Sequence, residues 1–377
     1  MSDAEKNPSC LFLLDSLGIG GSERKTIAAA NLLAERGYNI HLAFLNLKHD
    51  LGNTINPAIG TINLDCSSKV DMAAIKKLRH YIEKHSISVI WSVNLYPMFY
   101  AYLSTRNNKA IRVFGSSNVS LFRNKYEKLK MFIYVPIIWH LDGFIFGSTH
   151  QMREWKKKYP LGDGMQTVVH NGVDIGRFSR QGMNIDRLEA KRSFGIPVDN
   201  IVFGMVAQFR VEKAHQDLIA AAKNLCDQGV KLSLLLVGDG NTMNQIKTLV
   251  HHQGMEGIVV FTGLLEDVRP ALNAMDAFAL TSRAVETFSN AALEAMSMQL
   301  PVVLSDLAGA REMVDEGCNG YLYPPGDIGQ LTSCMNKFLD AKSRRQMANN
   351  ARELVKNRFS SSSMVDSYER IICGGTD

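Results

Sequence analysis

The feature that most constrains this chain is an alternation of short apolar segments with amphipathic helical segments, which runs through the first half and then starts again. This alternation is typical of a parallel sheet that helices cover on both faces. The expected strands are residues 11–14, 40–45, 89–93, 111–114, 143–146 and 167–169, followed by 200–206, 232–237, 258–262, 277–280 and 302–304. The pattern predicts an α/β fold with two Rossmann-like, doubly wound domains.

The break in this alternation sets the expected domain boundaries. Residues 177–197 have no period-two pattern and are interpreted as a linker. We expect an N-terminal domain over 1–176, a C-terminal domain over 198–358, and a helix within 359–377 that packs back on the N-terminal domain. Ligands of open α/β sheets bind beyond the carboxyl ends of the strands, so two such sheets facing each other across a cleft suit the joining of two substrates.

The composition of the 377 residues is that of a globular protein, with 46% hydrophobic and 21% charged residues, which excludes wholesale disorder. The longest strongly apolar run is residues 131–139, too short for a spanning helix of about 20 residues. The N-terminal segment does not resemble a signal peptide, and six cysteines are scattered without metal-ligand spacing. We therefore expect a cytoplasmic protein with reduced thiols.

Positive charge is concentrated in the first half of the chain. Residues 1–174 carry 21 Lys and Arg against 14 Asp and Glu, whereas the remainder carries 21 against 23. Such a surplus favours an anionic membrane, nucleic acid or a phosphorylated substrate as partner, although an ordinary solvated surface has the same signature. Nucleic acid is disfavoured because the bases form no stripe with stacking aromatics.

Three loops after expected strands have residues suited to phosphate. Gly20 and Gly21 lie in a strand-to-helix turn where a ligand can approach backbone amides, although neither the P-loop nor the dinucleotide fingerprint is present. Arg210 and Lys213 follow the strand at 200–206, where two cations can hold a diphosphate. Gly238 follows the strand at 232–237. Each loop on its own is equally compatible with a structural turn or a solvated surface.

The segment 286–296 is the most specific. Glu286 precedes an expected helix that begins at Ser289 or Asn290, whose amides can bind an anion. Glu294 lies one to two turns into that helix, and a carboxylate there can accept hydrogen bonds from vicinal sugar hydroxyls. A capped surface helix with two solvated glutamates is the alternative.

Glu286 and Glu294, with the residues that follow them to Asp306, resemble the signature of the retaining glycosyltransferases of family 4, which have the GT-B fold. Six other segments agree in order along the chain, and the likeness is strongest over residues 167–330. These segments are residues 18–23, 169–174 with Phe178, 212–213, 237–240, 261–263 and 320–327.

The resemblance implies a role for each candidate residue. Lys213 would hold the donor diphosphate, with Arg210 standing in for an arginine that the family commonly has at the position of Gln208. Glu294 would bind the ribose, Glu286 the transferred sugar, and backbone amides near Phe288 and Ser289 the phosphates. Gly20, Gly21, Gly238 and Asn290 complete the implied donor site. Many relatives have a histidine near the transferred sugar. This chain has none at that place, so Ser116 or Asn118 would take its role, or the role is absent.

The resemblance also implies the reaction: transfer of a hexose or N-acetylhexosamine, with retention and without a metal, from a nucleotide-diphosphate sugar to a glycan or lipid-linked acceptor. No cofactor is expected, UDP is favoured over GDP, and the chain contains no Asp-x-Asp sequence. Cell-envelope polysaccharide or glycolipid synthesis is the expected setting. Stabilising the departing diphosphate would be the main catalytic work.

The N-terminal domain is expected to hold the acceptor. Residues 122–136 mix basic with aromatic and aliphatic residues, and Arg153 and residues 156–158 add positive charge near Trp155. This segment is either a face that rests on the inner surface of the cytoplasmic membrane or a buried helix.

Two other functions remain open at this point. One is a nucleotide-sugar epimerase or hydrolase on the same fold, which product analysis with and without an acceptor would distinguish. The other is a non-catalytic carbohydrate-binding protein, which absence of nucleotide binding would favour.

Overall fold

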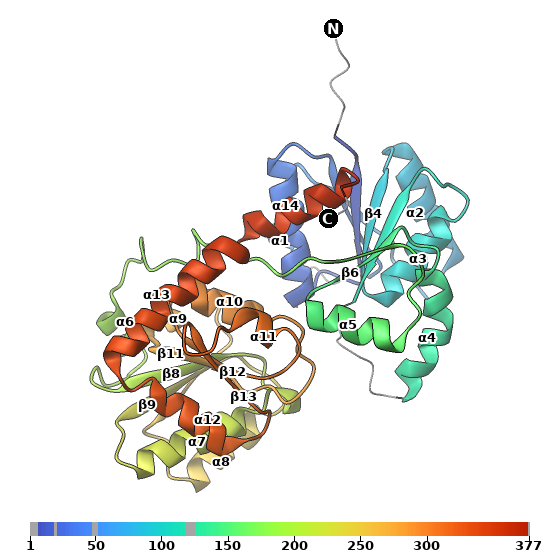
Figure 1. Ribbon diagram of the computed structural model, residues 1–377. Helices are drawn as coiled ribbons and strands as arrows, with labels where there is room; N and C mark the ends of the chain where they lie inside the picture. Colours follow the sequence, from blue (N-terminus) through green and yellow to red (C-terminus); the bar gives the residue numbers. More distant parts are fainter. Residues whose placement is uncertain (1–6, 19–20, 47–51, 118–124, 376–377) are drawn as a thin grey trace. The chain divides into compact units, whose positions relative to one another are not determined.

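The computed structural model describes residues 7–18, 21–46, 52–117 and 125–375. The chain divides into two compact units, Met1–Asn171 with Ser361–Asp377, and Gly172–Ser360 (Figure 1). Among the described residues, no helix combines the length and apolar character that crossing a membrane requires.

The first unit has a sheet of seven strands in the order β3-β2-β1-β4-β5-β6-β7, in which all neighbours are parallel. Its elements are β1 (Cys10–Leu14), α1 (Gly21–Glu35), β2 (Ile40–Phe44), the 3-10 helix η1 (Gly52–Thr54), β3 (Gly60–Asn63), α2 (Met72–Lys84), β4 (Val89–Val93), α3 (Leu95–Thr105), β5 (Arg112–Ser116), α4 (Lys125–Ile138), β6 (Gly143–Phe146), α5 (Thr149–Lys158), β7 (Met165–Val168) and α14 (Ser361–Ile372).

The second unit has a parallel sheet of six strands in the order β10-β9-β8-β11-β12-β13. Its elements are α6 (Arg187–Ser193), β8 (Ile201–Val206), η2 (Val211–Lys213), α7 (His215–Asp227), β9 (Leu232–Val237), α8 (Met243–His252), β10 (Val259–Gly263), α9 (Arg269–Ala274), β11 (Ala277–Leu280), α10 (Asn290–Ser297), β12 (Val302–Ser305), α11 (Ala310–Met313), β13 (Gly320–Tyr323), α12 (Ile328–Lys337) and α13 (Ala341–Arg358).

The sequence pattern missed one edge strand of each sheet. β3 is short and only partly buried, so its residues lack a continuous apolar run. β13 begins at Gly320, where a Cβ atom would lie 2.2 Å from the Val302 carbonyl oxygen. Its start therefore depends on close approach to β12, a relation that is absent from the local sequence. Residues 177–197, expected as a linker, belong to the second unit and include α6.

Alternation along β1 separates two cores in the first unit. Leu11 and Leu13 pack with residues of α2, α3 and α5, whereas Cys10, Phe12 and Leu14 pack with residues of α1 and α14. Both faces of the sheet are therefore covered, as a buried parallel sheet requires. The second unit has one large core around its own sheet.

The terminal helix α14 belongs to the first unit, where it lies beside α1 (Figure 1). Arg36, directly after α1, pairs with Asp366 at 2.7 Å and with Glu369 at 2.5 Å. Tyr368 packs edge-on against Trp91 of β4, with ring centroids 4.7 Å apart. One end of the chain thus completes the core that the other end begins.

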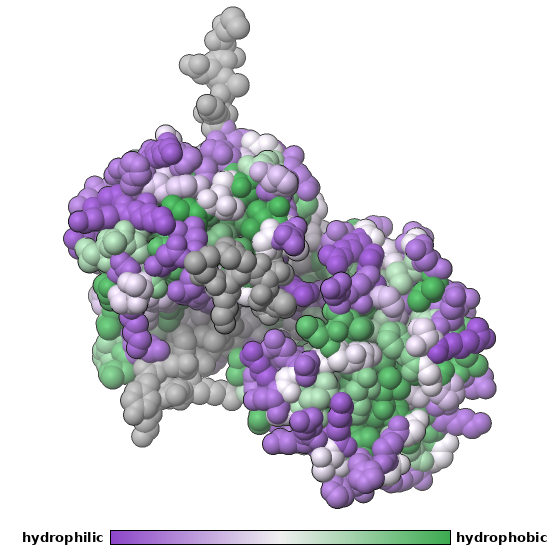
Figure 2. Space-filling view, turned by 180° about the vertical axis from the view of Figure 1, so that it is seen from behind, coloured by the Kyte–Doolittle hydropathy of each residue, from purple (hydrophilic) through white to green (hydrophobic). Residues whose placement is uncertain are grey.

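The helix α4 is neither fully buried nor fully exposed. Met131, Ile137 and Ile138 are buried, but Leu129, Phe132, Ile133 and Trp139 expose between 52% and 79% of their surface. Isolated apolar residues are common on protein surfaces, and Figure 2 shows hydrophobic areas among hydrophilic ones on the visible face. Four exposed large apolar residues within eleven positions are more than the isolated ones that are common on protein surfaces.

Candidate active site

The candidate site lies where the strand order of the second sheet reverses. β8 and β11 are neighbours in the sheet but not in the sequence, and crevices at such points bind ligands beyond the carboxyl ends of the strands. Lys213 ends η2, which follows β8, and Glu286 lies in the loop after β11. The topology thus brings together two residues that are 73 positions apart.

Lys213 and Glu286 form an ion pair at this crevice. Lys213 Nζ lies 2.6 Å from Glu286 Oε2, and Ser282 Oγ donates a hydrogen bond to the same oxygen at 2.9 Å. The lysine and glutamate side chains are 20% and 16% exposed. The pair is therefore shielded from bulk water yet open to a ligand, and the ammonium is already held at one fixed point.

Contacts between the two loops hold this pair in place. Thr281 Oγ1 donates to the carbonyl oxygens of Lys213 and Ala214, both at 3.0 Å. The Arg283 amide donates to the Glu212 carbonyl at 2.8 Å. The Arg283 guanidinium also grips the buried Asp217 carboxylate through two hydrogen bonds of 2.7 Å. Such bidentate pairs fix orientation as well as distance.

Both residues of the pair adjoin a strained backbone position. Ala214 has φ 49° and Val285 has φ 55°, in the left-handed region that residues with a side chain rarely adopt. For a β-branched valine this conformation is a clear outlier, and such outliers cluster at functional sites because the surrounding structure must enforce them. Their positions directly after Lys213 and directly before Glu286 agree with a functional assignment.

The helix α10 begins beside Glu286 with a capped N-terminus. Ser289 Oγ accepts a hydrogen bond from the Ala292 amide at 3.2 Å, and Asn290 is the first helical residue. Phe288 is buried against the ring of Phe359, so its side chain anchors the loop. The half-buried Glu294 lies in the second turn of α10. The positive end of the helix dipole and a carboxylate are thus on one element.

Gly238 is required by the packing of two loops. It has φ 135°, and a Cβ atom there would lie 2.1 Å from the Ala207 carbonyl oxygen. The nearby Gly240 is similarly crowded by the backbone of Phe209, which stacks its ring on the buried His215 at 4.0 Å. Glycine at 238 therefore brings the loop after β9 against the loop after β8, which carries Lys213.

Arg210 is placed differently from Lys213. Its side chain is 57% exposed, and its nearest carboxylate is Glu212 at 3.8 Å. It lies directly before η2, three residues before Lys213.

His215, two residues after Lys213, is neutral at pH 7. Its burial, followed by the charge of Lys213, lowers the pKa of its imidazole to about 4.

The remaining predicted residues lie in the first unit. Gly21 is the first residue of α1, and Ser116 ends β5, where its hydroxyl donates to the Ser92 carbonyl oxygen at 3.2 Å. Gly20 and Asn118 lie outside the described residues.

The sequence pattern missed Asp15, which follows β1 at the point where the first sheet reverses its strand order. Its carboxylate bonds to the side chain of Asn94, a residue held at φ 77° after β4. Burial raises the pKa of Asp15 to about 6, and the charge of Glu23 acts in the same direction. A single Asp directly after an apolar strand is the signal that was available in the sequence.

Replacing Asp15 with asparagine is expected to raise the melting temperature at pH 7.5 but not at pH 4. Because the folded-state pKa lies above the ordinary 3.8, the native state holds its proton more firmly, and stability falls as pH rises from about 4 to 6. Asparagine has no proton to lose, so the variant does not lose stability over this pH range. Melting curves at both pH values test this, with the exposed Asp163→Asn as control. A variant that melts at or below the wild-type temperature at pH 7.5 contradicts it.

Two family models match nearly consecutive parts of the chain. "Glycosyltransferase Family 4" matches residues 19–177, and "Glycosyl transferases group 1" matches residues 186–354. The second match contains every candidate residue of the second unit.

Curated relatives agree with these matches. The chain is 27% identical over 376 residues to N-acetyl-alpha-D-glucosaminyl L-malate synthase of Bacillus anthracis, covering 94% of this chain and 93% of that protein. It is 28% identical over 203 residues to the UDP-Gal:alpha-D-GlcNAc-diphosphoundecaprenol alpha-1,3-galactosyltransferase of Escherichia coli, covering 53% and 52% of the two chains.

Among solved structures, Anabaena Alr3699/HepE in complex with UDP superposes with a TM-score of 0.84 at 21% identity, covering 97% of this chain and all of that one. The sucrose-phosphate synthase of Thermosynechococcus elongatus superposes with a TM-score of 0.81 at 17% identity, covering 97% and 98%. These likenesses concern the fold. The two family matches show that the chain belongs to the family 4 type of glycosyltransferases, and the structural likenesses, with the two parallel-sheet units, show that it has the two-domain GT-B fold.

Proposed function

We propose that this glycosyltransferase moves a hexose or N-acetylhexosamine from a nucleotide-diphosphate sugar to a glycan or lipid-linked acceptor with retention of configuration. The observation that carries the donor assignment is the Lys213–Glu286 pair at the reversal point of the second sheet, beside the capped start of α10. Together, these elements offer a cation and the positive end of a helix dipole to the phosphates, and a carboxylate to the sugar.

In the proposed reaction, the bond between the anomeric carbon and the diphosphate oxygen breaks while the acceptor hydroxyl oxygen bonds to that carbon on the same face. The hydroxyl proton passes to the departing diphosphate. Lys213 stabilises the negative charge that develops on the phosphates, and Glu286 orients the sugar hydroxyls. Glu294 holds the ribose. Because no protein nucleophile and no metal take part in this scheme, activity is expected to persist in EDTA.

We favour UDP over GDP as the carrier. The name of the Escherichia coli relative specifies a UDP-sugar and a lipid-diphosphate acceptor, and the Anabaena structure contains UDP. These facts concern those proteins and support the same ligand class here.

Thermal shifts with UDP, GDP and ADP test the carrier, because a ligand that binds the native state raises the melting temperature by mass action. UDP is expected to give the largest shift. Incubation with the corresponding sugar conjugates and a lipid-linked acceptor, with and without EDTA, then tests the reaction, and NMR of the product gives its anomeric configuration. A product with inverted configuration, or turnover only without acceptor, contradicts the proposal.

We also propose that α4 rests on the inner surface of the cytoplasmic membrane. Phe132 and Ile133 expose 79% and 61% of their surface, and the exposed Lys130 adjoins them. Apolar side chains that enter the interface, combined with bases that attract anionic lipid, are typical of peripheral helices.

Replacing Phe132 and Ile133 together with serine is expected to reduce sedimentation with anionic liposomes at least about fivefold, because the inserted apolar area is lost. The melting temperature is expected to stay unchanged, since both side chains are exposed in the native state. Leu188→Ser, an exposed apolar change on α6, is the control. Equal sedimentation of all three proteins at low salt contradicts the membrane assignment.

A further inference from the structure

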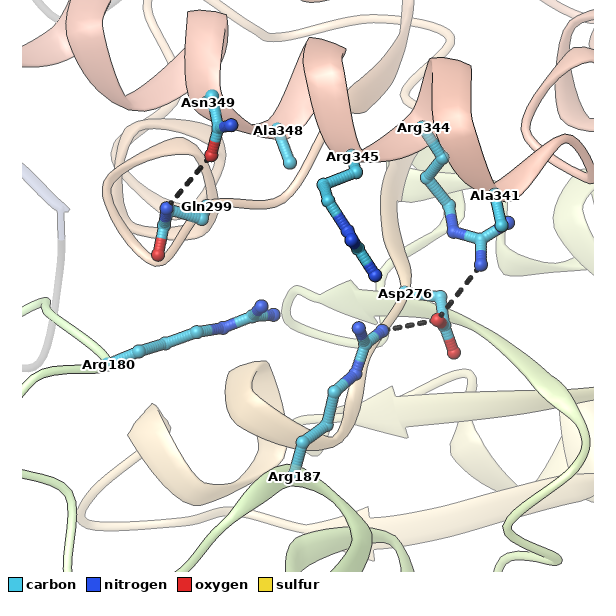
Figure 3. Close-up of a pocket in the computed structure, with 9 residues that line it drawn as sticks. All are labelled: Arg180, Arg187, Asp276, Gln299, Ala341, Arg344, Arg345, Ala348 and Asn349. Atoms are coloured by element: carbon cyan, nitrogen blue, oxygen red, sulfur yellow. Dashed lines mark hydrogen bonds and ion pairs between the residues drawn. The ribbon is translucent and has the colours of Figure 1, made fainter.

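A second cluster of cations lies in the second unit, at the opposite edge of the sheet from Lys213. A cavity of about 290 Å³ is lined by Arg180, Arg187, Arg344, Arg345 and Asp276, together with neutral residues (Figure 3). Asp276 immediately precedes β11, whereas Glu286 follows that strand. Strand β11 therefore separates this cavity from the candidate donor site.

Asp276 is fully engaged by its neighbours. Its Oδ1 atom pairs with Arg187 and with Arg344, the latter at 3.6 Å. Its Oδ2 atom pairs with Lys191 at 3.0 Å and accepts the Val202 amide hydrogen bond at 2.9 Å. Three cations thus already share this one buried carboxylate.

Two further arginines point into the same space, as Figure 3 shows. Neither Arg180 nor Arg345 has a carboxylate partner within ion-pair distance in the described part of the chain. The Nε atoms of Arg180 and Arg187 are buried and lack hydrogen-bond partners there. A buried donor without a partner is costly, and the one hydrogen bond given for Arg180, from Nη2 to the Met275 carbonyl oxygen, is long at 3.4 Å, so this arrangement is incomplete as it stands.

The charge of the cavity favours an anion. Four arginines and one aspartate line it, which leaves a surplus of three positive charges. Burial, followed by the charge of Arg187, lowers the pKa of Arg180 to about 10, yet this guanidinium remains protonated at pH 7. A bound anion would offset the mutual repulsion and satisfy the free donors. Guanidinium groups match phosphate oxygens in pairs, and the volume accommodates a phosphate group.

We propose that this cavity, defined by Arg180, Arg187, Arg344 and Arg345, is a binding site for a dianionic phosphate group that is separate from the donor site. Inorganic phosphate and a small phosphate monoester share the required chemistry. The site is formed by the segment before α6, by α6 itself, by the start of β11 and by α13.

The test measures the binding of inorganic phosphate and of glycerol 3-phosphate by calorimetry and by melting temperature, against chloride at equal ionic strength. At least one of the two is expected to raise the melting temperature above that in chloride. Whichever of the two compounds binds more tightly shows whether the site takes free phosphate or a phosphate monoester. If neither stabilises the protein beyond chloride, the proposal is overturned.

Three variants locate the bound phosphate. Arg345→Gln removes an exposed guanidinium that has no ion-pair partner among the described residues, so the ligand-free protein should melt as the wild type does while its phosphate affinity falls at least about fivefold. Lys356→Gln removes one charge elsewhere on α13 and should leave the affinity unchanged. Lys213→Met should also leave it unchanged. Equal affinity in Arg345→Gln and wild type, or loss of binding in Lys213→Met, overturns the proposal, and the latter would place the phosphate at the donor site.

Discussion

Replacing Lys213 with alanine is expected to lower turnover at least about tenfold, which corresponds to about 1.4 kcal/mol in the transition state. Lys213 is the cation held at the reversal point of the second sheet, with its Nζ atom 2.6 Å from Glu286 Oε2. In the proposed reaction, its charge matters most when the bond to the sugar breaks and negative charge grows on the diphosphate. The loss should therefore fall mainly on kcat, measured as product formed at saturating donor.

The double variant with Glu286 separates catalysis from stability. Lys213→Ala leaves the half-buried Glu286 carboxylate with one partner fewer, which destabilises the fold as well as the reaction. Adding Glu286→Gln removes the negative charge that has lost its lysine and should restore the melting temperature but not the turnover. Lys223→Ala, which removes an exposed lysine paired with Asp227, is the matched control. Full turnover in Lys213→Ala would remove this residue from the mechanism.

Replacing Glu294 with alanine is also expected to lower turnover with a limiting donor concentration at least about tenfold, again about 1.4 kcal/mol. Glu294 lies half-buried in the second turn of α10, the helix whose start is capped by Ser289. In the proposed donor site, this carboxylate accepts hydrogen bonds from the two vicinal ribose hydroxyls, an interaction made in both the ground state and the transition state. The effect should therefore appear in KM and in the dissociation constant of UDP.

Two comparisons sharpen this assignment. Glu294→Gln keeps one acceptor oxygen and should lose less affinity for UDP than alanine does. A 2′-deoxy form of the nucleotide should bind wild type more weakly but the alanine variant no more weakly, because the partner carboxylate is already absent. Glu353→Ala, an exposed change on α13, is the control for loss of charge. If Glu294→Ala and wild type bind UDP equally, the ribose contact is elsewhere.

The central strands were predictable because their apolar runs are long enough to require burial. Strands β1, β4, β8 and β9 coincide with such runs almost residue by residue. The edge strands β3 and β13 were not predictable in this way, because one is half exposed and the other is set by close approach to its neighbour. Local periodicity reports burial, and burial is incomplete at an edge.

The candidate site also has parts that the local sequence indicates and parts that depend on tertiary contacts. Segment 286–296 was recognisable because its capping serine, helix and glutamates lie within a few residues of one another. Asp15 was missed because its raised pKa comes from burial in the folded chain, which the hydrogen bond with Asn94, 79 positions away, offsets only in part. The arginine cavity was missed for a similar reason. Its arginines lie in two parts of the chain more than 150 positions apart, at 180 and 187 and at 344 and 345, and neither part alone indicates a cavity.

The α/β alternation, its restart in the second half and the resemblance of segment 286–296 were all evident from the amino acids alone, since each depends on residues close together in the chain. The three-dimensional structure was needed to show that Lys213 pairs with Glu286, that α14 completes the first unit, and that four arginines and Asp276 line one cavity. Those pairings depend on which strands become neighbours in a sheet. Strand order is set by the packing of whole helices and sheets, and local periodicity carries no record of it.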